Sequence, residues 1–225
     1  MMYINPTKKG LGIEIWGTYD DLRLFYNTIS KFWNNTNNLP QKGSENRDHL
    51  ISGFSYEIRK AKEGSRLVRN PSQFPSLLQE YYGVQVSWVH ALFSLTAIKF
   101  NMQYSETSKL DISQILLFEF WLEDAMMKFD GKGAKELAGY IEDGLYGANP
   151  CIYQYMRSIN LDFFILKGGV RAFRKLPQLL RRGVYYTEEY KDYQKFLENE
   201  AQKLKCEVSD LELSDDDFDY ESIEW

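Results

Sequence analysis

The sequence predicts an α+β fold: a predominantly helical single domain with a small N-terminal β-hairpin or sheet and an acidic C-terminal tail. Three observations predict it. Near the N-terminus apolar residues alternate with polar ones, the period of a half-buried strand, and beyond residue 18 they recur mostly at spacings of three and four, the period of a helix. The last nineteen residues hold nine carboxylates and no Lys or Arg. We therefore expect a globular domain over residues 1–206 and a tail over residues 207–225.

The first unit has the pattern of a β-hairpin that leads into an amphipathic helix. Strands are predicted over residues 2–5 and 11–16, separated by a turn rich in Pro, Lys and Gly. Thr18 follows as a predicted N-cap, with two aspartates in the first turn of a helix over residues 19–33.

The remaining elements are mostly helices. Residues 34–47 and 69–75 contain the clearest loop signals, Asn, Pro and Gly. Helices are predicted over residues 48–62, 89–102, 112–129, 135–145, 152–159, 169–182 and 188–205, and a short strand over residues 82–88. The segment 48–62 also fits a strand. The helix over residues 112–129, capped by Asp111, is apolar nearly all round and is predicted to be the central buried helix.

Charge is distributed unevenly along the chain. The formal net charge of −5 combines a tail of −9 with residues 1–206, which hold all 27 Lys and Arg and the other 23 acidic side chains and so carry +4. A block of like charge repels itself and buries little apolar surface, so the tail is expected to be disordered or to dock on a basic surface. Aromatic residues make up 16% of the chain, which predicts a well-filled core or an aromatic-rich contact surface.

Residue types that catalyse reactions or bind metals are scarce. His49 and His90 are the only histidines; His49 is expected to be exposed at a helix start, and His90 to lie in the core or a cleft. Glu119 and Glu123 are one helical turn apart, but no Glu-x-x-His accompanies them, so we interpret them as solvent-facing rather than as metal ligands. We therefore expect no metal site and no cofactor.

Several features predict a cytoplasmic protein without a membrane partner. No apolar run reaches the roughly 18 residues that span a bilayer, and the N-terminus lacks the apolar stretch of a signal peptide. The two cysteines, Cys151 and Cys206, are far apart and do not form a metal-binding or redox pair, which favours free thiols in a reducing compartment.

The densest polar motif lies over residues 55–66. On a helix, Glu57 would share a face with Lys60 or Ala61, and Arg59, Lys62 and Arg66 could form a basic edge. Glu57, Arg59 and Arg66 are the polar residues of interest. These three residues are the candidate catalytic site of an enzyme acting on phosphate or nucleic acid. A structural ion pair explains them equally well.

A resemblance to a known family rests on this motif and on the N-terminal unit. The residues that carry it are Tyr3, Pro6, Thr7, Gly10, Gly12, Ile13, Gly17, the run Tyr19-Asp-Asp-Leu22, Tyr26, Ile29, the run Tyr56-Glu-Ile-Arg-Lys-Ala61, Gly64, Arg66, the run Tyr82-Gly-Val84 and Trp88. With them the chain resembles a bacterial family of unknown function, most clearly over residues 1–105. The resemblance implies that Glu57, Arg59 and Arg66 belong to the family's signature segment, that no activity can be transferred, and that the acidic tail lies outside the family's pattern.

A basic stretch over residues 157–182 is the natural counterpart of the tail. If residues 169–182 form one helix, basic side chains gather on it beside an apolar face, and Pro177 kinks it or ends its first half. The predicted binding residues of this stretch are Arg171, Arg174, Lys175, Arg181 and Arg182. Such a helix can bind nucleic acid or an acidic protein, or it can be a solvated surface.

The tail itself carries apolar anchors among its acids. Phe218, Tyr220 and Trp225 are the predicted binding residues, since a purely solvating tail does not need them. Two acceptors remain open: a partner protein, or the basic residues 171–182 of the same or a neighbouring molecule, which would produce self-association.

These observations favour an interaction protein over an enzyme. We expect a cytoplasmic regulatory protein, such as an inhibitor, immunity or defence-system component, that binds another protein through aromatic residues and its acidic tail. The alternatives are an enzyme with Glu57, Arg59 and Arg66 at its site, and a nucleic-acid binder that uses residues 157–182.

Overall fold

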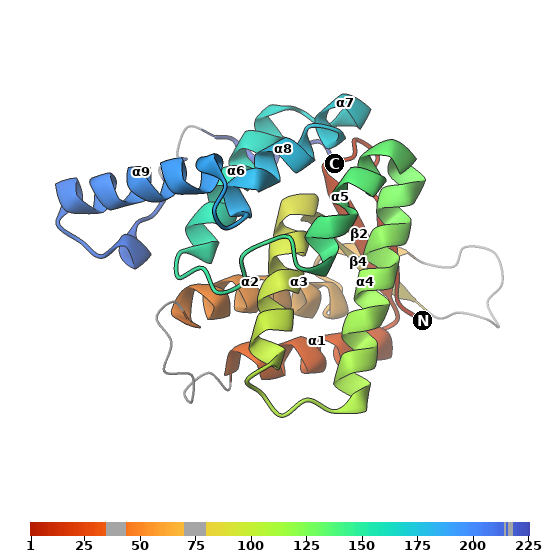
Figure 1. Cartoon of the computed structure of the whole chain (residues 1–225). Coiled ribbons are helices and arrows are strands. Elements are labelled where there is room, and N and C mark those ends of the chain that lie inside the picture. Colours follow the sequence, from red (N-terminus) through yellow and green to blue (C-terminus); the bar gives the residue numbers. More distant parts are fainter. Residues whose placement is uncertain (35–43, 70–79, 214, 216–217) are drawn as a thin grey trace.

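A computed structural model describes residues 1–34, 44–69, 80–213, 215 and 218–225 of the chain. Four strands form one antiparallel sheet (Figure 1). In spatial order they are β1 (Tyr3–Pro6), β2 (Gly12–Gly17), β4 (Tyr81–Ser87) and β3 (Leu67–Arg69). Ile13 and Ile15 are fully buried, as their alternation predicts. The predicted α+β fold, the hairpin and the strand near residues 82–88 are confirmed, whereas β3 was not predicted.

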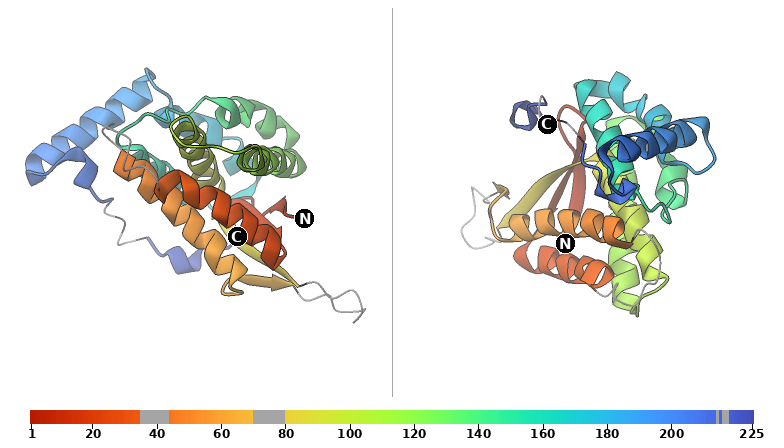
Figure 2. Two further views of the ribbon diagram at one scale, coloured as in Figure 1. Left: turned by 90° about the horizontal axis from the view of Figure 1, so that it is seen from below. Right: turned by 90° about the vertical axis from the view of Figure 1, so that its left-hand side faces the viewer.

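Helices make up most of the structure. They are α1 (Tyr19–Asn34), α2 (Ser44–Lys62), α3 (Trp88–Met102), α4 (Lys109–Phe129), α5 (Gly131–Glu142), α6 (Ile152–Ile165), α7 (Gly169–Phe173), α8 (Leu176–Leu180) and α9 (Glu188–Leu204), with short 3₁₀ segments η3 (Arg181–Gly183), η4 (Val208–Asp210) and η5 (Tyr220–Ser222). Figure 2 shows α1 and α2 packed side by side. Residues 48–62 are helical, and α2 begins already at Ser44, inside the predicted loop. The rest of that loop, residues 35–43, and most of the break at 69–75 lie outside the described residues.

The central helix is α3, and the prediction that residues 112–129 fill this place is wrong. Most of α3 is buried, including Trp88, whose indole nitrogen donates to the Gly10 carbonyl at 3.0 Å. By contrast α4 buries one face only, and Leu116 and Phe120 on its other face are more than half exposed. Periodicity could not separate the two helices, because both are rich in apolar residues.

The caps of α4 and α5 also differ from the prediction. Ser108, not Asp111, is the N-cap of α4, and Asp111 completes a capping box from the third helical position. The predicted end of α4 at residue 129 is confirmed, but the next helix begins before residue 135, because Asp130 accepts from the Gly133 amide at 2.8 Å and caps α5.

The predicted helix over residues 169–182 is wrong as a single element. It consists of α7, α8 and η3, with Pro177 in the first turn of α8. Proline has no amide hydrogen to continue the hydrogen bonds of a preceding helix, which favours a new start at this position. The basic side chains therefore belong to three short elements rather than to one helical face.

Candidate functional site

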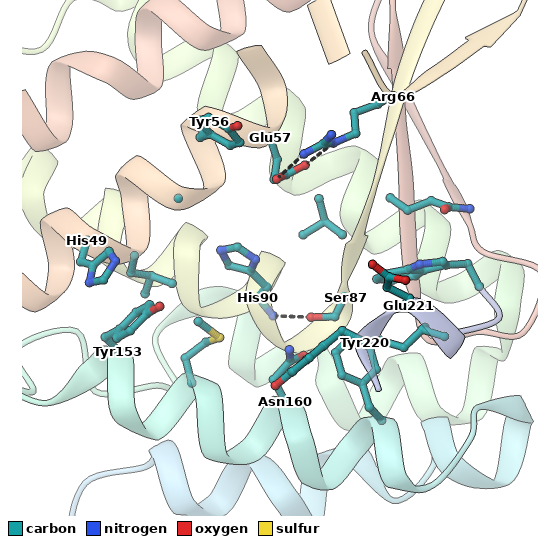
Figure 3. Close-up of a pocket in the computed structure, with 18 residues that line it drawn as sticks. His49, Tyr56, Glu57, Arg66, Ser87, His90, Tyr153, Asn160, Tyr220 and Glu221 are labelled. Atoms are coloured by element: carbon teal, nitrogen blue, oxygen red, sulfur yellow. Dashed lines mark hydrogen bonds and ion pairs between the residues drawn. The ribbon is translucent and has the colours of Figure 1, made fainter. Parts of the chain in front are cut away.

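The candidate site is a cleft of about 950 Å³ between α2, β4, α6 and the C-terminal tail (Figure 3). It is lined by His49, Leu50, Gly53, Tyr56, Glu57, Arg66, Gln85, Val86, Ser87, His90, Tyr153, Met156, Asn160, Phe164, Tyr220, Glu221, Ile223 and Trp225. Four stretches far apart in the sequence thus meet here: the signature segment, β4 with the start of α3, α6, and the tail.

Both histidines lie in this cleft. His49, near the start of α2, stacks on Tyr153 of α6, with ring centroids 4.2 Å apart. The backbone amide of His90 donates to the Ser87 hydroxyl at 3.0 Å, which caps α3 and fixes the first turn of this helix at the cleft. Burial lowers the pKa of His90 to about 4, although Glu57 and the Leu50 carbonyl act in the opposite direction. His90 is therefore neutral at neutral pH.

Glu57 and Arg66 form the charged pair of the cleft. Arg66 donates from Nε to Glu57 Oε2 at 2.8 Å and from Nη2 to Oε1 at 2.9 Å (Figure 3). This hydrogen bonding raises the pKa of Arg66. A bidentate pair occupies both groups in one geometry. Arg66 must leave Glu57 before it can offer the same fork to a phosphate group.

One polar atom of the cleft has no partner. Asn160 Oδ1 is buried and accepts no hydrogen bond from any group of the described chain. Asn160 lies on α6 beside Tyr220, at the end of the cleft away from Glu57 (Figure 3). An acceptor left alone in this way is a contact point for a ligand that carries an N–H or O–H donor.

The tail forms one wall of the cleft. Phe164 of α6 is its principal anchor, because the rings of Phe218, Tyr220 and Trp225 lie 6.1, 6.4 and 5.8 Å from it. Phe164 is 7% exposed. It also lines a neighbouring cavity of about 440 Å³ that Phe218 closes from the tail side. The tail anchors predicted from sequence therefore converge on one buried ring.

Ion pairs hold the tail at two places. Arg157 Nη2 donates to both carboxylate oxygens of Asp215, at 2.9 and 3.0 Å. Near the end of the chain, Lys9 Nζ lies 3.0 Å from Glu224 Oε2. The Tyr220 hydroxyl also donates to Asp215, and these hydrogen bonds from Tyr220 and Arg157 lower the pKa of Asp215. Burial raises the pKa of Tyr220 to about 12, and its hydrogen bond to Asp215 adds to this effect.

Upstream of these contacts the tail is fastened by an amide. Gln154 Nε2 donates to the Ser209 carbonyl at 2.8 Å, and Leu211 beside it is buried. Asp215, Tyr220 and Trp225 thus follow a stretch already attached to α6, and they need only a short path to reach the cleft.

The structure brings together two of the three predicted catalytic candidates. Arg59 does not join Glu57 and Arg66, because it lies over the Tyr56 ring at 5.0 Å and beside Glu63 at 4.0 Å. It lines a separate cavity of about 360 Å³ instead.

The predicted basic residues are mostly paired with acids of their own body. Arg174 pairs with Asp130 at 2.6 Å, Arg181 with Glu189 at 2.6 Å and Arg182 with Asp162 at 2.8 Å. The Arg174 pair, with the Gly133 amide, lowers the pKa of Asp130 to about 2. Among the described residues no ion pair joins Arg171, Arg174, Lys175, Arg181 or Arg182 to the tail.

Sequence reasoning missed the true seat of the tail. Arg157 was visible only as one member of the basic stretch, Lys9 as part of a turn, and Phe164 as one of fourteen phenylalanines. No pattern in the sequence distinguishes them, because they lie close together only in the folded chain.

In the described part of the chain, no three His, Cys, Asp or Glu side chains gather as metal ligands. No helix there has the length and apolar character needed to cross a bilayer.

The family of the chain can be assigned by comparison. A family model described as "Domain of unknown function (DUF6904)" matches residues 2–225. No curated protein and no solved structure matches the chain with statistical significance. The expected resemblance to an uncharacterised family is confirmed and extends well beyond residue 105. The prediction that the tail lies outside the family's pattern is wrong, because the match runs through Trp225.

Proposed function

This chain belongs to the DUF6904 family, whose description names no activity, and we propose from its cleft that it is a regulatory interaction protein of the cytoplasm. In this proposal the cleft is a receptor for an acidic, aromatic peptide segment, and the protein's own tail is the resident occupant. A partner protein with a segment of similar chemistry competes with the tail, as expected of an inhibitor, immunity or defence-system component.

The observation that carries this proposal is how the tail is seated. Three tail rings contact Phe164. Asp215 pairs with Arg157, and Glu224 pairs with Lys9. Apolar anchors fix affinity in linear-motif recognition, while flanking charges fix direction and register. The tail has both, in a segment too short to fold alone.

The tail is also buried so little that a competing peptide segment could displace it from the cleft. Of the described tail residues Leu211 alone is buried; the others are partly or fully exposed. Segments with few buried contacts open at a small fraction of the global unfolding free energy. Tail release would leave α2, β4 and α6 in place and would uncover Phe164 for an incoming segment, beside the partly exposed ring of Tyr153.

The proposal can be tested with a labelled synthetic peptide of residues 207–225. The peptide is titrated into the full chain and into a full-chain variant with Phe218→Ala and Trp225→Ala, whose own tail competes less. We expect the variant to bind the peptide at least about tenfold more tightly than the unmodified chain, because the resident tail no longer occupies the cleft.

Two controls make this test decisive. A peptide with the same charges but with Phe218, Tyr220 and Trp225 replaced by Ala should not bind, and Arg157→Gln in the receptor should weaken binding. Equal binding of the two peptides would reduce the interaction to nonspecific charge attraction. Absence of binding to the variant would refute the receptor role.

An enzyme acting on phosphate or nucleic acid is the second candidate, because Glu57, Arg66 and both histidines line one cleft. Its difficulty is that Arg66 is already held by Glu57 in a bidentate pair. Calorimetric titration with inorganic pyrophosphate, comparing the chain with Arg66→Gln, tests this candidate. Binding that disappears in the variant supports it, and no binding to either chain removes the phosphate site.

Nucleic-acid binding through residues 157–182 receives less support. Arg157, Arg174, Arg181 and Arg182 are engaged by acids of the same chain, so fewer cations face outward than the sequence suggests. Titration with single- and double-stranded DNA at low salt tests it, since phosphate contacts produce strongly salt-dependent binding.

A further inference from the structure

An apolar stripe runs along the outer face of α4. Ile112, Leu116, Phe120 and Met127 are 42, 59, 56 and 50% exposed. Lys109 and Glu123 are exposed on the same face. With about 100° between successive residues, these six side chains fall within a band of about 80°. We refer to them as the α4 stripe.

The rest of α4 explains why this stripe is unusual. The opposite face packs on the body through Ile115, Phe118, Leu122, Ala125 and Met126. Among the described elements, α4 packs mainly against β1, α5 and α1, and it lies at the edge of the molecule in Figures 1 and 2. A surface helix normally presents polar side chains on its outer face, so a continuous apolar stripe marks an interaction surface.

The charges of the stripe are arranged in a self-complementary way. Leu116 is the midpoint: Ile112 and Phe120 lie four residues to either side, and Lys109 and Glu123 lie seven residues to either side. Two such helices placed antiparallel about Leu116 would put Ile112 opposite Phe120 and Lys109 opposite Glu123. The same surface thus complements a second copy of itself, which is the requirement for a two-fold interface.

Neither of these charges is neutralised within the chain. No ion pair joins Lys109 or Glu123 to another described residue, whereas the neighbouring Glu119 pairs with Lys99 at 3.4 Å. Burial and the nearby carboxylates of Glu119 and Glu142 raise the pKa of Glu123, while Lys99 opposes this. A cation from a second molecule would relieve this repulsion.

We propose that the α4 stripe is the interface of a homodimer in which two copies of α4 cross antiparallel, with Leu116 on the two-fold axis. Leu116 packs against its own copy at the centre. Layers of Ile112 and Phe120 flank it, and pairs of Lys109 and Glu123 close the two ends. This surface is separate from the cleft and the tail, so the dimer does not depend on the proposed peptide receptor.

One helix pair buries little area compared with most stable dimers. We therefore expect a dissociation constant on the order of 10 µM, the weak end of specific association. Sedimentation equilibrium over a dilution series that brackets this value should show a mass rising from 26.5 kDa toward twice that figure. A single species of 26.5 kDa at all concentrations would overturn the proposal.

Charge reversal tests the antiparallel register. Lys109→Glu and Glu123→Lys should each raise the dissociation constant about tenfold, because each places like charges at both ends of the interface. The double variant should restore the original value. Lys195→Glu on α9 is the matched control, since Lys195 is exposed and far along the chain from α4. Failure of the double variant to restore association would exclude this register.

Cysteine cross-linking gives a readout that does not depend on affinity. In a Cys206→Ser background, Leu116→Cys should form a disulfide dimer under mild oxidation, because the two copies meet on the axis. Ile112→Cys should not, since its two copies would be eight residues, about 12 Å, apart along the helices. Cross-linking of Ile112→Cys as fast as Leu116→Cys would overturn the geometry. Unchanged dimerisation of Phe218→Ala would separate this interface from the tail.

Discussion

Replacing Phe218 by Ala is the sharpest test of tail docking, because it changes the tail and leaves the body intact. The Phe218 ring stacks on Phe164 at 6.1 Å. Such a pair contributes about 0.5–1.5 kcal/mol, and partial burial of the ring adds about 1 kcal/mol. We therefore expect the docked state to lose about 2 kcal/mol, which increases the population with a released tail about 30-fold.

The assay uses the chemistry of the tail itself. A protease that cleaves at aspartate attacks the tail only after release, and its cleavage rate follows the released population when docking is fast. The loss of the C-terminal fragment, followed by mass spectrometry, should be about 30-fold faster in Phe218→Ala than in the unmodified chain. Phe196→Ala on α9 is the matched control, since Phe196 is also a phenylalanine but is half exposed and outside the cleft.

Two results would refute this reasoning. Equal cleavage of the unmodified chain and Phe218→Ala would mean that ring contacts with Phe164 do not hold the tail. Equal acceleration in Phe196→Ala would mean that the substitutions loosen the whole chain rather than the tail. The free energy of unfolding in urea should change little for Phe218→Ala, because the tail contributes few buried contacts.

Three further predictions follow from the same structure. His90 has a pKa of about 4 when folded and about 6.5 when unfolded, so the unfolded state binds more protons between these values. The free energy of unfolding should fall by about 3 kcal/mol as the pH falls from 6.5 to 4, and His90→Asn should remove this slope in urea titrations. Gly10 has φ +67°, and an added Cβ would lie 1.8 Å from the Phe129 ring, so Gly10→Ala should lower the free energy of unfolding by about 3 kcal/mol. Gly139 in α5 has open space around it, so Gly139→Ala should raise the free energy of unfolding by about 0.5–1 kcal/mol. Because hydrogen bonds from Tyr220 and Arg157 lower the pKa of Asp215, its ion pair with Arg157 should persist at the usual aspartate pKa and weaken only as the pH falls below it. Proteolysis with an acid-stable protease should show that tail release rises there. Arg157→Gln should reduce this pH dependence, and the hydrogen bond from Tyr220 should retain the rest.

The sequence predicts the fold well where local pattern and tertiary packing agree. Alternation at Ile13 and Ile15 predicts β2, and the apolar spacing of residues 19–33 predicts α1 to within a residue. It fails where two helices have similar composition. The apolar character of residues 112–129 predicts burial, but four of the apolar residues belong to the outward α4 stripe. Only the packing of α3 against the sheet and α6 shows which helix is central.

The candidate site was predictable only in part. Glu57 and Arg66 are close in sequence, the first on α2 and the second in the turn that follows it, and this proximity favours their pairing. The sequence could not show that His90 and Asn160 line the same cleft as this pair, because only the packing of α3 against α6 brings them there. Pro177 is visible in the sequence as a kink or an end of the predicted helix, and the structure has a new helix, α8, with this proline in its first turn.

The position of the tail shows why charge matching misled the sequence prediction. Exposed ion pairs contribute about 0–1 kcal/mol each, so a basic surface alone attracts an acidic tail without fixing where it lies. A buried ring that contacts three tail aromatics supplies directional contact and apolar burial together. The tail therefore docks where Phe164 is available, and it uses only those cations within reach of that ring, Arg157 and Lys9. Arg174, Arg181 and Arg182 are already engaged by acids of the body, so less unpaired positive charge is left for the tail than the sequence suggests. For an acidic tail in other members of this family, the binding site should accordingly be predicted from the aromatic residues of the tail first and from its charge second.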